Sequence, residues 1–175
     1  MLTGKSVWHV NQGIGKFFAK DKIRGYYNNM IEKVTKMPEL LDNKDLPKLN
    51  LEGGKFTDFP VAIFQYGLGC YDLYIQTKDE RYINKFMQCV QWALEHQDDD
   101  GRWNNFSHYC PQAPYSAMAQ GEGTSLFVRA YIYTHKQSYL DAAKMAIDYM
   151  LLPIEDGGTT KYESDDAYLM EYTFK

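Results

Sequence analysis

Apolar residues follow the helical period most clearly between residues 58 and 152. Over 58–76 their spacing predicts a helix with Asp58 as its N-cap. A second stretch separates apolar from polar positions most completely, and it predicts a helix that follows Thr77 and Lys78 and stops at the turn of residues 98–101. The apolar face of this second helix carries Tyr82, Ile83, Phe86, Met87, Val90, Ala93 and Leu94.

The next helical pattern begins at Ser116, a residue type that favours the N-cap position. It contains Gly121 and Gly123 in its first half, where each glycine costs about 1 kcal/mol relative to alanine. Close approach of another backbone or of a ligand explains such glycines, and the interleaved Gln120 and Glu122 favour a helix end that faces a ligand. A fourth helix follows with apolar Leu140, Ala143, Ile147, Met150 and Leu151, and Pro153 closes it.

The two pairs of helices repeat at an offset of 57 residues, as between Thr77 and Thr134. The same offset relates Tyr74 to Tyr131, Ile75 to Ile132, Tyr82 to Tyr139, Val90 to Ile147 and Gly101 to Gly158. An inner helix, a tight turn, an outer helix and a return loop with glycine form the unit of an (α/α) toroid. We therefore predict a mainly α chain, a partial (α/α) toroid of two to three helical hairpins, whose inner helices over 58–76 and 116–133 line a cavity.

The two ends of the chain differ from this helical part. Residues 1–57 have one short helical pattern, over 26–36, among proline and glycine breakers, and predict an N-terminal arm or linker with one helix. Residues 58–175 form the toroid-like domain, and after Gly157 and Gly158 the alternation of β-formers predicts a short β-hairpin in which the chain stops. Two helical hairpins make only a sector of a ring, so we expect a homo-oligomer or missing domains to cover its apolar edges.

Composition and charge narrow the class of protein. The 175 residues, 45% hydrophobic and 24% charged, suit one globular domain. A net charge of −4 without an evident basic cluster argues against general nucleic-acid binding and gives no sign of a membrane-surface role, so we expect neither partner, although a local basic cleft stays open. The sequence has neither a signal-peptide pattern nor an apolar run of membrane-spanning length, so we expect this chain as it stands to be cytoplasmic.

The pattern of metal-ligating residue types favours no metal site. Three widely spaced cysteines read as free thiols, without the spacing of a disulfide framework or a zinc site. The three aspartates of residues 98–100 lack the alternating ligands of a calcium loop and favour a solvated turn. His108 and Cys110 have no partner at ligand or triad spacing, so they read as loop residues.

Several segments together resemble the C-terminal catalytic region of the D-glucuronyl C5-epimerase family, over roughly residues 26 to 174. They are Phe59-Pro-Val-Ala-Ile-Phe-Gln-Tyr-Gly-Leu68, the turn of residues 97–103, Tyr115-Ser-Ala-Met-Ala-Gln-Gly121, Val128-Arg-Ala-Tyr131 and the closing Glu171-Tyr172, with Tyr26-Tyr-Asn28 similar to the family's entry segment. The order and spacing of these segments carry the resemblance. Family members act without a redox cofactor, so the resemblance implies that no cofactor is needed.

The resemblance implies inversion of C5 of glucuronate within a heparan- or heparosan-type polysaccharide, by proton abstraction and return. Such chemistry requires neutralisation of the adjacent carboxylate and acid/base groups on both faces of the sugar ring. By resemblance, Tyr172 is the candidate acid/base and Glu171 its orienting or proton-relay partner. Family enzymes also use residues from further helices and from a β-rich N-terminal domain, which implies that this chain is a fragment or a shortened member, and eukaryotic full-length relatives imply the Golgi lumen.

Six residues are candidates for substrate binding: Gln65, Trp103, Tyr115, Gln120, Glu122 and Arg129. The amides and Glu122 suit sugar hydroxyls, Arg129 suits a uronate carboxylate, and Trp103 suits stacking on a sugar ring. Each has a structural alternative: ties between inner helices, a charge at a helix C-terminus, or a core aromatic. Two other functions stay open, namely a uronate polysaccharide lyase on a similar toroid and a non-catalytic helical module that binds glycan or protein.

Overall fold

The main helices form two hairpins that repeat along the chain, as the sequence predicts. A computed structural model describes residues 13–36, 46–50, 56–108 and 110–174. The first hairpin joins α2 (Pro60–Thr77) to α3 (Glu80–Glu95), and the second joins α4 (Ala117–Thr134) to α5 (Gln137–Leu151). Both α2 and α4 have 18 residues, and their bounds differ by the predicted offset.

The ends of α2 and α4 share one local design. Each helix is followed by a non-glycine residue in the left-handed region, Lys78 at φ 61° and His135 at φ 58°. The hydroxyls of Thr77 and Thr134 donate to the carbonyls of Leu73 and Ala130, at 2.8 and 2.7 Å. The repeat is therefore present in the backbone and in side-chain hydrogen bonds as well as in the sequence.

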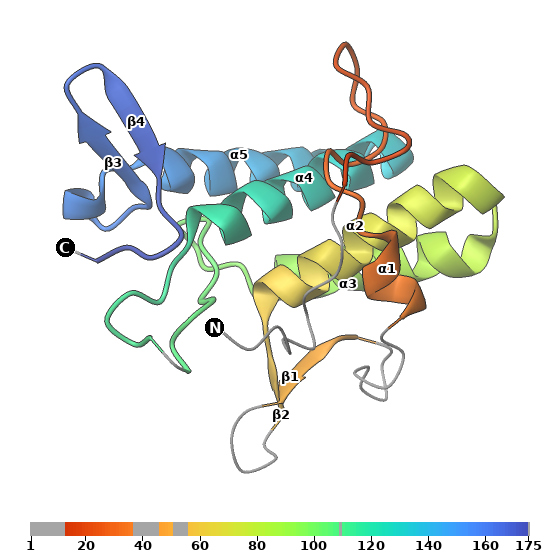
Figure 1. Cartoon of the computed structure of the whole chain (residues 1–175), viewed down its shortest axis with the longest axis horizontal. Helices are drawn as coiled ribbons and strands as arrows, with labels where there is room; N and C mark the ends of the chain where they lie inside the picture. The colour runs from red at the N-terminus through yellow and green to blue at the C-terminus, as the bar shows by residue number, and fades with distance from the viewer. Residues whose placement is uncertain (1–12, 37–45, 51–55, 109, 175) are drawn as a thin grey trace.

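The packing order agrees with a sector of an (α/α) toroid. Helix α2 packs against α3 and α4, and α4 packs against α5, so the two buried helices are inner and the two amphipathic ones are outer (Figure 1). Most residues of α2 and half of those of α4 are buried, whereas α3 and α5 keep a polar face in solvent. Phe64, Phe86, Val90, Leu126 and Phe127 are among the fully buried core side chains.

Two predictions about helix starts are wrong. Asp58 does not cap α2: it lies in β2 (Phe56–Asp58), which pairs with β1 (Lys48–Asn50), and its carboxylate forms an ion pair with Lys48. The helix expected over 26–36 is only α1 (Ile31–Thr35), because residues before it pair with an earlier segment through the Ile14–Asn28 bridge. The breakers that suggested a linker at residues 38 and 53–54 lie outside the described residues.

The N-terminal arm packs onto the inner helices. Met30 is fully buried, and a Cβ added at Gly69 of α2 would lie 2.4 Å from the Met30 carbonyl oxygen, so glycine is needed for this close approach. The backbone N–H of Tyr26 donates to Asp72 of α2, and Arg129 of α4 donates to the carbonyl of Gly25. The arm therefore covers part of the face that was expected to line an open cavity.

The C-terminal β-hairpin is present but ends earlier than predicted. After the short 3-10 helix η2 (Ile154–Asp156), β3 (Thr160–Glu163) pairs with β4 (Asp166–Leu169). The chain leaves the hairpin after Leu169, and the Met170 carbonyl accepts from the N–H of Ala117, the first residue of α4. Glu171 and Tyr172 therefore follow the hairpin rather than lie within it, and their segment is held at the start of an inner helix (Figure 1).

Within the described part of the chain, no helix is both long and apolar enough to cross a membrane. The three cysteines are buried free thiols.

Candidate functional site

A cleft of about 420 Å³ lies where the loop before α4, the turn after α5 and the C-terminal segment meet. Its wall consists of Gln112, Pro114, Tyr115, Ile154, Gly157, Gly158, Thr173 and Phe174. Of the predicted site residues, Tyr115 lines the cleft directly, and Glu171 and Tyr172 immediately precede two of its lining residues. The structure thus brings the start of the Tyr115–Gly121 motif together with Thr173 and Phe174, which follow the Glu171-Tyr172 pair.

Tyr172 lies between two aromatic rings beside this cleft. Its ring stacks on Phe106 with centroids 4.7 Å apart and on Phe174 with centroids 6.1 Å apart. Partial burial raises the pKa of Tyr172, and the charges of Glu171 and Cys110 raise it further. The phenol is therefore neutral near pH 7, which suits it to donate a proton rather than to remove one.

Glu171 is exposed, whereas Tyr172 is partly buried. A negative charge on Glu171 stabilises the neutral form of Tyr172, because it opposes a second negative charge close by. The acid/base role of Tyr172 and the relay role of Glu171 stay predictions, and the electrostatics favour only the donating half of that role.

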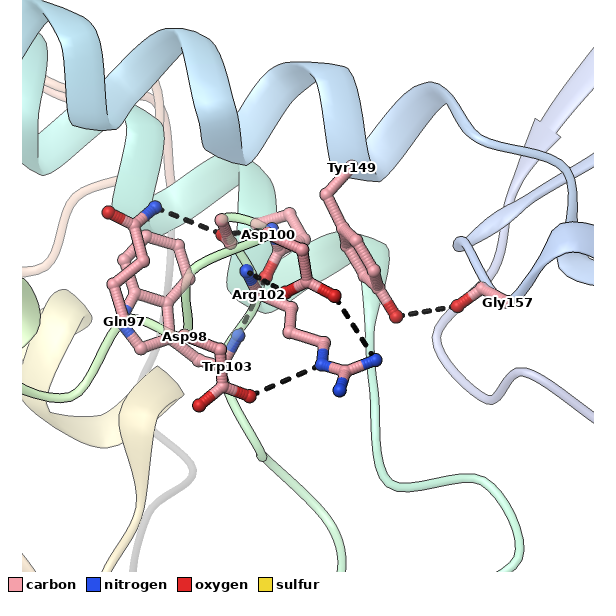
Figure 2. A network of polar contacts seen from close by, with 9 residues as sticks. Gln97, Asp98, Asp100, Arg102, Trp103, Tyr149 and Gly157 are labelled. Atoms are coloured by element: carbon pink, nitrogen blue, oxygen red, sulfur yellow. Dashed lines mark hydrogen bonds and ion pairs between the residues drawn. The ribbon is translucent and has the colours of Figure 1, made fainter.

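Arg102 and Tyr149 are two residues at this end of the molecule that the sequence reasoning missed. The Arg102 guanidinium lies 4.6 Å from the ring centroid of Tyr115 and 5.9 Å from that of Tyr149. It is also paired with Asp98 and Asp100, each at 3.2 Å (Figure 2). The turn of residues 98–101 is therefore an anchor for this arginine as well as a solvated turn.

Tyr149 is anchored by its hydroxyl, which donates to the carbonyl of Gly157 in the cleft wall (Figure 2). Burial raises the pKa of Tyr149 to about 12, and the nearby Arg102 lowers it in part. Its ring meets that of Tyr115 edge-on, with centroids 5.7 Å apart. Arg102 and Tyr149 together fix the ring of Tyr115 at the cleft. In the sequence, the only signal for this arrangement is that Tyr149 falls in the last turn of α5, next to the glycine loop.

Trp103 and Gln120 are too deeply buried to contact a substrate in this structure. Both are fully buried, and the indole N–H of Trp103 donates to the carbonyl of Ala93 at 2.9 Å. The side-chain amide of Gln120 donates to the carbonyls of Gly101 and Ala146, and its oxygen accepts from the backbone N–H of Trp103. Both side chains therefore hold core segments together. This is the structural role that was the alternative to substrate binding for each residue.

The glycines of α4 also have an internal explanation. A Cβ added at Gly123 would lie 2.5 Å from Cζ3 of Trp103 and 3.1 Å from Cε2 of Phe64, whereas one at Gly121 would meet only the Met150 sulfur, at 3.9 Å. Gly123 makes room for an indole ring rather than for a ligand. The expectation that this helix end faces a ligand is wrong for Gly123, because the partner that approaches it is the protein's own core.

Gln65 and Glu122 are partners of each other. The Gln65 amide donates to Oε1 of Glu122 at 2.9 Å, and the two residues occupy equivalent positions of α2 and α4. Glu122 is 5% exposed, and burial raises its pKa to about 8, while the Gln65 hydrogen bond and the charge of Lys33 lower it in part. This pair lies in the interior, away from the cleft that Tyr115 lines, and its predicted contact with sugar hydroxyls stays untested.

Arg129 lies in the second half of α4 and faces the N-terminal arm. Its guanidinium donates to the carbonyls of Ser125 and Gly25, and it lies 5.4 Å from the ring centroid of Tyr26. Twelve residues separate Ala117 from Arg129, which corresponds to about 18 Å along a helix. Arg129 therefore does not share the cleft with Tyr115. The described residues also include no group of three His, Cys, Asp or Glu side chains that could hold a metal ion.

Comparison with known proteins relates part of this chain to one family. Residues 97–175 match the family model described as the D-glucuronyl C5-epimerase C-terminus. A D-glucuronyl C5-epimerase of Caenorhabditis elegans is 28% identical over 106 residues, which cover 56% of this chain and 17% of that protein. The chain thus spans about a sixth of the length of this relative, and the cleft falls within the part that the family model matches.

Solved structures with a similar course of the chain include an alpha-1,6-mannanase, GH76A of Salegentibacter sp. HEL1_6. It is 18% identical with a TM-score of 0.47, over 68% of this chain and 37% of the mannanase. An inactive variant of that enzyme in complex with alpha-1,6-mannotriose is 17% identical with a TM-score of 0.47, over 66% of this chain and 36% of the other. Likeness at this level says nothing about the chemistry of the present chain.

Proposed function

We propose a function from one premise: residues 97–175 of this chain match the family model of the D-glucuronyl C5-epimerase C-terminus. The proposed activity is inversion of C5 of D-glucuronate in a heparan- or heparosan-type polysaccharide. One observation carries it. Tyr115 lines a cleft within the family-matched part together with Thr173 and Phe174, the two residues that follow the Glu171-Tyr172 pair, and the ring of Tyr172 stacks on that of Phe174.

The chemistry requires a proton to leave C5 and another to return on the opposite face of the ring. Loss of the C5 proton leaves an electron pair that is delocalised into the neighbouring carboxylate, so the reaction gains from nearby groups that stabilise this charge. Protonation of C5 from the opposite face then gives the epimer, with no net gain or loss of atoms. In this proposal a base on the first face takes the abstracted proton, and Tyr172, kept neutral by its raised pKa, supplies the second proton and regains one from solvent.

Arg102 and Tyr149 are positioning residues in this proposal. The guanidinium is held by Asp98 and Asp100 and stacks on Tyr115, so it orders the cleft wall without offering a free charge to the sugar. Because the chain covers 17% of its curated relative, the activity, substrate and partners of the whole protein are part of the proposal.

Solvent isotope exchange tests the proposal directly. The chain is incubated in deuterium oxide with a heparosan-like polymer, and deuterium at C5 of the uronate is measured. Incorporation at C5 supports epimerisation. Appearance of an unsaturated uronate that absorbs in the ultraviolet indicates a lyase instead, and glycan binding with neither product indicates a non-catalytic module.

The variant Tyr172→Phe tests the assigned residue. Removal of a general acid lowers a rate by about 10²–10⁴-fold, so we expect exchange to fall by that factor. The matched control is Tyr168→Phe, which removes a hydroxyl from an exposed residue of β4 outside the cleft wall. Unchanged exchange in Tyr172→Phe, or an equal loss in both variants, would remove Tyr172 from the mechanism.

A further inference from the structure

A second cavity, of about 500 Å³, lies between the loop of residues 18–27 and the middle of α4. Helix α4 contributes Thr124, Ser125, Val128 and Arg129 to its wall. The volume falls within the range of about 300–1,000 Å³ that is typical of small-molecule sites. This cavity shares no lining residue with the cleft at Tyr115, so it is a separate feature of the molecule.

The wall of this cavity is built around a buried cation. Arg129 is 7% exposed, and its two terminal nitrogens donate to the carbonyls of Ser125 at 2.9 Å and Gly25 at 2.8 Å. A Cβ added at Gly25 would lie 2.6 Å from Cβ of Phe17, so the loop can fold back at this point only with glycine. Arg129 thus fastens the loop to α4 behind the cavity, where its charge also interacts with the buried Asp72 of α2.

The loop itself is strongly basic, although the chain carries a net charge of −4. Lys20, Lys22 and Arg24 stand in it against a single carboxylate, Asp21. Lys20 and Lys22 line the cavity together with Asp21, and both lysines are exposed. Among the residues that the structure describes, neither lysine forms an ion pair. A basic cluster that did not stand out from composition is therefore gathered at one cavity, where it favours an anionic ligand.

Aromatic rings complete the wall. Phe18, Tyr26 and Tyr27 line the cavity, and Tyr27 is 54% exposed. Aromatic faces suit the apolar faces of sugar rings, whereas ammonium groups suit a carboxylate or a sulfate. This combination of ring faces and cations in one cavity is what an acidic sugar requires.

We infer that the cavity between residues 18–27 and α4 binds an acidic saccharide, with Lys20 and Lys22 paired to its carboxylate or sulfate group. The identification of the ligand as a uronate saccharide rests on the proposed function, whereas the binding of an anionic group does not. The site lies along the middle of α4, whereas the cleft lies at the start of this helix, so it binds a different stretch of a polymer from the stretch that reacts.

Calorimetric titration of the whole chain at low ionic strength tests this inference. The probes are a glucuronate-containing octasaccharide, the same octasaccharide with its carboxyl groups reduced to alcohols, and inorganic sulfate. The variant is Lys20→Ala with Lys22→Ala, and the control, matched in charge, is Lys136→Ala with Lys144→Ala, two exposed lysines of the second hairpin outside both cavities. Two exposed ion pairs of about 0.5–1 kcal/mol each correspond to about tenfold in affinity.

We expect the Lys20/Lys22 variant to bind the acidic octasaccharide about tenfold more weakly than wild type, and the control variant to differ by less than about twofold. The carboxyl-reduced octasaccharide and sulfate alone should bind much more weakly to wild type than the acidic octasaccharide does. Amide NMR signals of residues 18–27 and 124–129 should shift on titration. All four substituted lysines are exposed, so equal thermal midpoints of the variants will show that the fold is intact.

Three results would each overturn the inference: equal affinity of the two double variants, equal binding of the carboxyl-reduced octasaccharide, or shifts confined to the cleft at Tyr115. If sulfate binds as tightly as the octasaccharide does, the cavity is a general anion site, and the inference that it binds a saccharide is refuted. The proposed function can fail independently of this inference. In that case the wild-type chain still binds the octasaccharide but exchanges no deuterium at C5.

Discussion

Substitution of the two glycines of α4 by alanine provides the sharpest test of the packing described above. Both substitutions gain about 1 kcal/mol of helix propensity, because each removes a glycine from a helix interior. They differ in what the new methyl group meets. At Gly121 its nearest neighbour is the Met150 sulfur at 3.9 Å, an ordinary contact, whereas at Gly123 it meets two carbons of Trp103 at 2.5 and 2.6 Å.

The clash at Gly123 cannot be relieved cheaply. Trp103 is fully buried, its indole N–H is bonded to Ala93, and Phe64 and Phe127 pack around the ring. Overpacking of this kind costs about 1–3 kcal/mol. Gly121→Ala should therefore stabilise the protein by about 0.5–1 kcal/mol, and Gly123→Ala should be less stable than Gly121→Ala by about 1–3 kcal/mol.

Urea unfolding measures both values, as shifts of the midpoint at unchanged slope. The cause is tested in a Trp103→Phe background, which removes the indole carbons that the methyl group would strike. Gly123→Ala should cost less there than in wild type, with a coupling energy of about 0.5–3 kcal/mol. Equal stability of the two alanine variants, or absence of coupling to Trp103, would refute the view that Gly123 exists to accommodate the indole.

Three further predictions concern the interior. Gln120→Leu should lower the free energy of unfolding by about 2–4 kcal/mol in urea titrations, because two carbonyls and one N–H lose their hydrogen-bond partner. The control is an exposed site such as Gln91→Leu, and a smaller loss in Gln120→Leu than in this control would contradict the prediction. The pKa of Glu122, raised to about 8 by burial, means that the folded state holds a proton that the unfolded chain releases near its usual pKa, so stability should fall as pH rises from about 5 to 9. Glu122→Gln should flatten that decline, and an equally steep decline in the variant would exclude Glu122 as its source. Met30→Ala should cost about 2–5 kcal/mol and leave one cooperative transition; a separate early transition would show that the arm unfolds independently of α2.

Much of the fold could be predicted from the chain's periodicity. The two amphipathic stretches became α3 and α5, the repeat offset reappeared in the bounds of α2 and α4, and the β-hairpin formed where alternation predicted it. These features depend on near neighbours along the chain, which is why spacing alone reveals them. The cap assigned to Asp58 failed because a strand pairing outside the helix pattern takes that residue into β2.

The candidate site was less accessible to sequence reasoning. Tyr115 lines the cleft and Glu171 and Tyr172 immediately precede two of its lining residues, whereas Trp103 and Gln120 are internal. Polar and aromatic residues suit a ligand and a core equally well until the depth of each side chain is known. Arg102 was overlooked because its partners, Tyr115 and Tyr149, lie on elements that only folding brings near the turn.

Periodicity and motif order predicted the class of fold, the repeat and a resemblance to the family whose model matches residues 97–175, because both are properties of the linear chain. Only the tertiary structure decided which residues meet across elements: Gln65 with Glu122, Gly123 with Trp103, and the basic loop with α4. The physical reason is that burial and electrostatic environment depend on every segment packed around a group. The same glycine or lysine therefore has a different meaning once its neighbours in space are known.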